Sequence, residues 1–247
     1  MNFVAIDPSL SCTAMVVNDV KYVYTTEGVA HTKKGELKRW FKECEDQGVT
    51  IRVYPDIPKT DSHSNLEILK FLQYTAIAND IKTDIIANER SNVVSKIDRH
   101  WHIAIEGYSY SSAAGPLIDL VTFGTTLRHT LNQWLPLNVD WYYAKLSILQ
   151  PTEVKQQAAA MVYPPIIKGK KVEYRNADGI AGGSFKKPQI YQALLDHSGL
   201  KDDKWVNFIR GHSEEILEMK SIPKPIEDIN DAKTLYEIIK GPKPLDK

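Results

Sequence analysis

The sequence has little cysteine, no apolar run long enough to cross a membrane and no net charge. Its 247 residues include two cysteines, Cys12 and Cys44, too few for a zinc site built from two cysteine pairs. Free thiols are typical of a reducing compartment, so we expect a cytoplasmic protein, in the host cytoplasm if the chain is viral. The N-terminus lacks the charged-then-apolar pattern of an export signal, and we expect no contact with membranes.

The charge balance gives no sign of a partner. The sequence has 31 basic and 31 acidic residues. This balance is a mild argument against a protein that wraps DNA broadly. A local basic surface beside an acidic site stays open, because carboxylates in a site offset basic residues in the sum. The hydrophobic and charged fractions, 43% and 25%, are those of an ordinary globular protein.

Short apolar runs alternate with helical patterns along the chain. We predict strands at residues 2–6, 13–17, 21–25, 49–54 and 102–105, and at Val139, Trp141 and Tyr143. Residues 13–25 read as a hairpin across Asn18 and Asp19. We predict helices at residues 33–47, from Ser64, and at 116–131, 152–161 and 188–195, with a last one starting near Ile229. This order indicates an α/β fold with a five-stranded mixed sheet flanked by helices, in a single domain over residues 1–247.

One stretch is basic and rich in turn-forming residues. Residues 163–187 contain two adjacent prolines, several glycines and a set of cations: Lys168, Lys170, Lys171, Arg175, Lys186 and Lys187. We interpret residues 163–183 as a long loop, and loops of such length are usually functional or disordered. If it reaches a DNA arm, it contacts phosphates; otherwise it is a surface loop without a role.

Four acidic residues fall where metal ligands are useful. Asp7 ends one apolar strand and Glu106 ends another, and Asp228 and Asp231 lie three residues apart on one face of the last helix. If the two strands are neighbours and the helix crosses them, the four carboxylates converge and repel one another unless a cation neutralises them. Oxygen ligands select Mg²⁺ or Mn²⁺, and two such ions about 4 Å apart can cleave a phosphodiester.

Each of these residues also has an ordinary explanation. Asp7 before Pro8 is a common turn signal, and Glu106 before Gly107 is a common strand end facing water. Asp228 and Asp231 suit a helix N-cap and a first turn, where acidic side chains complement the helix dipole. Only the joint placement of the four favours a metal site.

The sequence segments around these residues resemble motifs of RuvC-type Holliday-junction resolvases, which belong to the RNase H-like superfamily. The resemblance rests on four segments in family order: residues 3–14, residues 103–106, residues 151–155 continuing at 181–190, and residues 228–232. Two stretches depart from the family as insertions, a helical one at about 29–48 and the basic one at 163–183.

The resemblance implies an RNase H-like fold and an endodeoxyribonuclease. It implies a homodimer that holds a four-way junction and nicks two strands symmetrically by two-metal hydrolysis, leaving a 5′-phosphate. Asp7 would bridge both ions, Glu106 would hold one, and Asp228 and Asp231 the other. We expect the apolar helix at residues 116–131 to form the dimer interface.

Basic and aromatic residues complete the expected DNA site. Lys155, Lys186 and Lys187 are candidates for phosphate contacts, or equally for a solvated charged face. Tyr108 and Tyr110 follow Glu106 and are candidates for stacking on unpaired bases, or for packing in the core or in an interface.

Other functions stay open at this point. An actin-like ATPase or sugar kinase also opens with a strand ending in an acidic residue, and residues 178–183 suggest a second phosphate loop. A non-catalytic DNA-binding protein that keeps the fold is another reading. A third is the same metal chemistry on flaps, replication forks or RNA–DNA hybrids.

Overall fold

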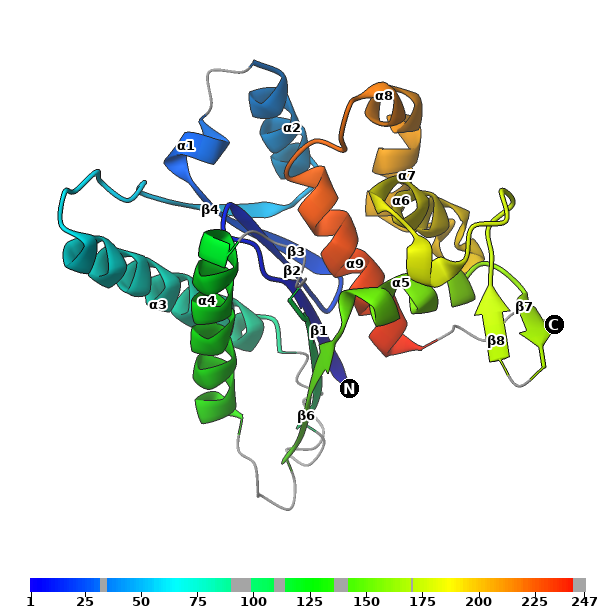
Figure 1. Cartoon of the computed structure of the whole chain (residues 1–247), viewed down its shortest axis with the longest axis horizontal. Helices are drawn as coiled ribbons and strands as arrows, with labels where there is room; N and C mark the ends of the chain where they lie inside the picture. Colours follow the sequence, from blue (N-terminus) through cyan, green and yellow to red (C-terminus); the bar gives the residue numbers. More distant parts are fainter. Residues whose placement is uncertain (32–34, 90–98, 109–113, 136–141, 170, 242–247) are drawn as a thin grey trace.

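A six-stranded mixed sheet runs through the molecule, with helices on both faces (Figure 1). The computed structural model describes residues 1–31, 35–89, 99–108, 114–135, 142–169 and 171–241. The strands are β1 (Asn2–Asp7), β2 (Cys12–Val17), β3 (Val20–Thr26), β4 (Thr50–Tyr54), β5 (Arg99–Glu106) and β6 (Tyr142–Leu149), in the order β4-β3-β2-β1-β5-β6. The expected α/β class is confirmed. Each of the six predicted strand segments has a counterpart in the sheet, so the expected five-stranded sheet was one strand short.

The first three strands form an antiparallel ribbon. Strand β1 pairs with β2, and β2 pairs with β3 across a tight turn at Asn18 and Asp19. Both turn residues have positive φ, 47° and 73°, which asparagine and aspartate tolerate better than most residues. The Asn18 side chain also accepts a hydrogen bond from the Phe3 backbone N–H at 3.1 Å. The hairpin expected from the sequence is therefore confirmed.

The parallel part of the sheet brings together two segments distant in sequence. Strand β5 runs parallel to β1, and β6 runs parallel to β5. Val4 and Ile6 are buried on one face of β1 and Ala5 on the other. A central strand covered on both faces needs a continuous apolar run, which explains the composition of β1.

Different helices cover the two faces. Helices α3 (His63–Ala87) and α4 (Ala114–Trp134) lie on the face of Val4 and Ile6. The opposite face carries α9 (Ile226–Lys240), which packs across β1 and β2. Around α9 lie α2 (Gly35–Asp46), α5 (Pro151–Ala160), α6 (Lys187–Asp196), α7 (Lys204–Gly211) and α8 (Ser213–Glu218), and a short α1 (Glu27–Ala30) precedes α2. The helices expected at 33–47, 152–161 and 188–195 are confirmed as α2, α5 and α6, whereas α7 and α8 were not predicted.

Two element boundaries differ from expectation. Helix α3 begins at His63, and its N-cap is Ser62, whose side chain accepts from the Asn65 backbone N–H at 3.2 Å. The helix expected from Ser64 therefore begins one residue earlier, and Ser62 is its N-cap. The strand expected at Val139–Tyr143 begins only at Tyr142 and continues to Leu149, and Val139 and Trp141 lie outside the described residues.

The basic stretch after α5 is a hairpin and not a loop. Strands β7 (Pro165–Lys168) and β8 (Lys171–Tyr174) pair in antiparallel register, with Ile167 opposite Val172. The β-branched residues at these positions favour strands, which the count of glycines and prolines concealed. Lys170 lies outside the described residues. Two short 3₁₀ turns, η1 (Gly182–Ser184) and η2 (Ser198–Leu200), flank α6.

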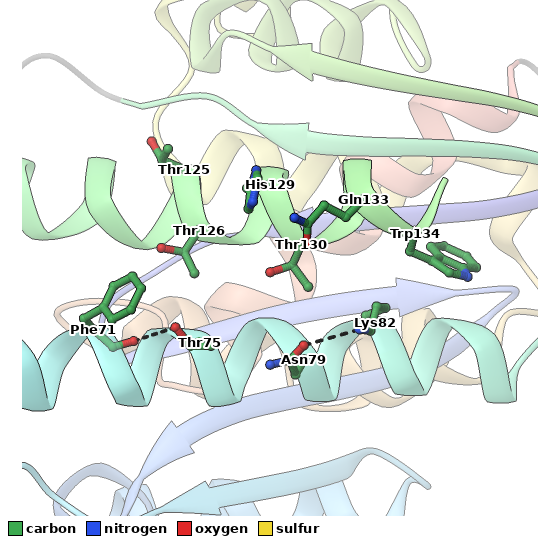
Figure 2. Close-up of a pocket in the computed structure, with 10 residues that line it drawn as sticks. All are labelled: Phe71, Thr75, Asn79, Lys82, Thr125, Thr126, His129, Thr130, Gln133 and Trp134. Carbon is green, nitrogen blue, oxygen red and sulfur yellow. Dashed lines mark hydrogen bonds between the residues drawn. The ribbon is translucent and has the colours of Figure 1, made fainter. Parts of the chain in front are cut away.

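A groove of about 540 Å³ lies between α3 and α4 (Figure 2). Threonine, asparagine and glutamine side chains form much of it, and its lining is Phe71, Thr75, Asn79, Lys82, Thr125, Thr126, His129, Thr130, Gln133 and Trp134. Ile118 and Val121 are exposed elsewhere on α4. The homodimer interface expected on this helix stays a prediction. In the part of the chain described, no helix is both long and apolar enough to cross a membrane.

Candidate metal centre

The site begins at the ends of two neighbouring parallel strands. Asp7 is the last residue of β1 and Glu106 is the last residue of β5. The register pairs Ile6 with Ile105, so the next residue of each strand lies at the same edge of the sheet. The two carboxyl groups are joined by a side-chain hydrogen bond. The placement expected for Asp7 and Glu106 is thus found in the structure.

Helix α9 brings two more carboxylates to this edge. Asp228 and Asp231 are buried, with 4% and 6% of their surface exposed, and the charges of both act on Asp7. The helix begins at Ile226, three residues before the expected start, so Asp228 lies in the first turn and Asp231 in the second. Asp228 is therefore not the N-cap of this helix, and Asp231 is not in its first turn. The four residues nevertheless meet in one neighbourhood.

Burial and mutual repulsion make these groups hard to ionise. Burial, followed by the charges of Glu106 and Asp231, raises the pKa of Asp7 well above its usual value. Burial raises the pKa of Asp231 to about 7, and it also raises the pKa of Glu106 and of Asp228. A carboxylate without water needs a nearby cation or hydrogen bonds to stay charged. The cluster therefore favours any cation that enters it.

Lysines supply part of the missing positive charge. Lys187, the first residue of α6, forms an ion pair with Asp231 and lies 3.6 Å from Glu227 Oε1. Lys224 Nζ donates to Asp228 Oδ1 at 2.7 Å. Lys155, on α5, is close enough that its charge lowers the pKa of Glu106. The other oxygen of Asp228, Oδ2, is buried and accepts no hydrogen bond from a lysine among the described residues. The Cys12 thiol lies close enough to this carboxyl group to lower its pKa.

These residues suit a hard divalent cation. All four donors are carboxylates, and oxygen-only sites select Mg²⁺, Mn²⁺ or Ca²⁺ over softer metals. The buried Asp228 Oδ2 gives an oxygen with acceptor capacity that no described lysine uses in the same cluster. However, no trio among the four, all within the described residues, has its oxygens within 4.8 Å of one another.

A second acidic group does reach that spacing. Oxygens of Asp19, Asp203 and Glu237 lie within 4.8 Å of one another, close enough to hold a metal ion. A lysine already stands among them: Lys233 Nζ is 2.7 Å from Asp203 and 2.8 Å from Glu237. Sequence reasoning missed this group because a turn, a helix N-cap and a helix interior contribute one residue each, and no local motif joins them.

The residues expected to contact DNA are distributed unevenly. Lys155 and Lys187 lie at the carboxylates, whereas Lys186 is the exposed N-cap of α6. Tyr108 lies against α4, where the guanidinium of Arg128 covers its ring at 4.6 Å. This packing accounts for Tyr108 without a stacked base. Tyr110 lies outside the described residues.

Comparison with known proteins finds one distant, partial similarity and no matching family model. A trans-alpha-bergamotene synthase from Phyla dulcis is 23% identical over 203 residues, which cover 79% of this chain and 34% of that protein. The chain thus spans about a third of the length of the curated relative it matches. At this identity the similarity does not assign a family.

The comparison contradicts the function expected from the sequence. The protein found is a terpene-forming synthase by its name, which is a different function from cleavage of branched DNA. The expected junction-resolving function is corrected on this finding and is not carried further. The resemblance to the RuvC-type family stays an untested prediction.

Proposed function

We propose that this protein is a divalent-cation-dependent enzyme that hydrolyses phosphate esters, with its centre at Asp7, Glu106, Asp228 and Asp231. The observation that supports it is the meeting of four carboxyl groups with raised pKa values at one sheet edge, with Asp228 and Asp231 buried and the other two partly exposed. Three lysines beside the carboxylates could attract an anionic substrate. The branched-DNA substrate expected from the sequence is not part of this proposal.

Each carboxylate has a place in the proposed centre. Asp7 lies beside Glu106, and the charges of Asp231 and Asp228 also act on it. In this proposal Asp7 is therefore the ligand that a cation would share with the other carboxylates. Asp228 brings a buried oxygen that, among the described residues, accepts no hydrogen bond from a lysine. A divalent cation held there would neutralise phosphate charge and lower the pKa of a bound water.

The positive side chains serve the substrate in this proposal. Lys155 lies on α5, which follows β6 directly, and its charge lowers the pKa of Glu106. Lys187 approaches from α6. Lysine binds phosphate as a compact charge without requiring one orientation, which suits a site whose substrate changes geometry during reaction.

One glycine of the candidate kinase phosphate loop has a packing explanation in the structure. The segment at residues 178–183 was a candidate phosphate loop because of its glycines. A β-carbon on Gly182 would lie 2.6 Å from the Ala159 β-carbon of α5. Close packing against α5 therefore explains this glycine, and no phosphate is required to account for it.

The test is a panel of small phosphate compounds. The purified chain is incubated with bis(p-nitrophenyl) phosphate, p-nitrophenyl phosphate and inorganic diphosphate, with Mg²⁺, with Mn²⁺ or with EDTA. We expect metal-dependent hydrolysis of at least one compound, lowered at least about a hundredfold by Asp7→Asn and by Glu106→Gln.

The matched control is Asp19→Asn, which removes a carboxylate from the other acidic group. It should leave the hydrolysis rate unchanged. Failure to hydrolyse any of the three compounds with either metal, or hydrolysis that Asp7→Asn leaves intact, would reject the proposed function.

A further inference from the structure

Lys187 differs from the other lysines of the cluster in its access to solvent. Its side chain is 48% exposed, against 30% for Lys224, although its ammonium group pairs with the 7% exposed carboxylate of Asp231. The aliphatic part therefore lies at the surface while the charged end enters the site. Because half of the side chain already contacts water, Nζ can leave the site without repacking the core.

The backbone that carries Lys187 is well anchored. Helix α6 buries Ile190, Tyr191 and Leu194, and the Tyr191 hydroxyl donates to the Ile209 carbonyl at 2.7 Å. Its first turn is closed by the Lys186 backbone N–H, which donates to Gln189 Oε1 at 2.8 Å. A change in the position of the ammonium group thus involves side-chain rotation alone.

The charges around Lys187 are those that a metal ion would use. Its ammonium group is in contact with Asp231, and its charge also lowers the pKa of Asp7 and of Glu106. The ammonium group is therefore close to three of the four proposed metal ligands. A divalent cation carries twice its charge, and two cations cannot share one small group of carboxylates without strong repulsion.

We propose that the ammonium group of Lys187 is an internal stand-in for the metal: a divalent cation entering among Asp7, Glu106 and Asp231 displaces it toward solvent, where it meets the anionic substrate. This inference rests on the proposed metal-dependent function and adds to it a positioning role for one residue. The buried Asp228 Oδ2 is an independent sign that the cluster has acceptor capacity that Lys187 does not satisfy.

The first experiment measures metal affinity. Mn²⁺ is titrated calorimetrically into the wild-type chain, Lys187→Met and Lys186→Met at one pH near 7.5. Methionine keeps the length of the side chain and removes the competing charge, so Lys187→Met should bind Mn²⁺ at least about tenfold more tightly than the wild type. Lys186→Met removes the neighbouring exposed lysine and should bind like the wild type.

The second experiment needs no variant. Amines of the wild-type chain are acetylated briefly with and without Mg²⁺, and the modification of Lys187 is compared with that of Lys186 by mass spectrometry. Released from its ion pair, Lys187 should be acetylated several-fold faster in Mg²⁺, while Lys186 should not change.

The outcomes separate the two proposals. If the wild type and Lys187→Met bind Mn²⁺ with the same affinity, or Lys187→Met binds more weakly, the displacement is wrong while the metal centre stands. Acetylation of Lys187 that does not respond to Mg²⁺ counts against the displacement in the same way. If no variant binds Mn²⁺ at millimolar concentration, the metal centre and the displacement both fail.

Discussion

Helix α9 takes part in two acidic clusters that differ in where their lysines lie. Its first two turns carry Asp228 and Asp231, whose partners Lys224 and Lys187 are partly exposed. Farther along, Glu237 meets Asp203 and Asp19 around Lys233, which is completely buried. The second cluster contains its own cation, and the first has its lysines at its margin.

The difference favours the first cluster as the proposed metal centre and the second as a structural ion-pair network. A buried lysine held by two close carboxylates orders the chain, and removing it leaves uncompensated buried charge. In the first cluster the paired lysines are partly exposed and can move away, so the carboxylates can bind another cation, and their pKa values are raised. Spacing between oxygens alone selects the second group, but it takes no account of the lysine in the middle.

The largest expected effect comes from breaking the structural cluster. Lys233→Met leaves Asp203 and Glu237 without their buried cation, and we expect the free energy of unfolding to fall by about 3–5 kcal/mol. Urea denaturation followed by circular dichroism measures it. Adding Glu237→Leu to Lys233→Met should recover part of the loss. A single variant as stable as the wild type would contradict the structural assignment.

Asp7→Asn should act on metal binding and leave the fold intact. We expect the Mn²⁺ affinity to fall at least about a hundredfold, or about 3 kcal/mol, because the residue lies among the other three carboxylates. Calorimetric titration gives the affinity, and the thermal midpoint without metal should be equal to or above that of the wild type. Retention of wild-type affinity would remove Asp7 from the metal centre.

The stability of the metal-free protein should depend on Asp231 and on pH. Its pKa is about 7 in the folded chain against 3.8 in the unfolded one, so the folded state holds the proton over a wider range. The protonated Asp231 carboxyl group contributes to the free energy of unfolding below pH 4, and this contribution is lost as the pH rises to about 7.

Asp231→Asn removes this penalty. We expect it to stabilise the metal-free chain at pH 8 by roughly 1–4 kcal/mol and to have little effect near pH 4. Denaturant titrations at the two pH values measure both. A destabilised variant at pH 8 would mean that the ion pair with Lys187 outweighs the cost of burial.

The smallest effect is expected at Asp19. This residue is 46% exposed and 3.7 Å from Lys233, so water screens the interaction. Asp19→Asn should change the free energy of unfolding by less than about 0.5 kcal/mol and leave Mn²⁺ binding as it is. If Mn²⁺ affinity falls in this variant, the group at Asp19, Asp203 and Glu237 holds the metal and the comparison above is reversed.

Local patterns in the sequence determined much of the fold. The apolar run of β1, the Asn18–Asp19 turn and the helical spacings of α2, α5 and α6 each depend on neighbouring residues, and each is found in the structure. Composition misled at residues 163–183, where glycines and prolines suggested a loop and paired β-branched residues formed a hairpin. Helix α7 was missed although Asp203 caps it and its buried residues Trp205 and Ile209 lie at helical spacing. Helix α8 has only six residues, too few for a clear helical period.

The sequence also placed Asp7 and Glu106 at strand ends and Asp228 and Asp231 on one helix. Tertiary structure alone decided that β1 and β5 are parallel neighbours and that α9 crosses them, since pairing of distant strands depends on the packing of the whole sheet. It alone decided that Lys233 fills one acidic cluster while Lys187 only borders the other. The charge balance of a buried group depends on neighbours from several distant segments, and no local pattern records them.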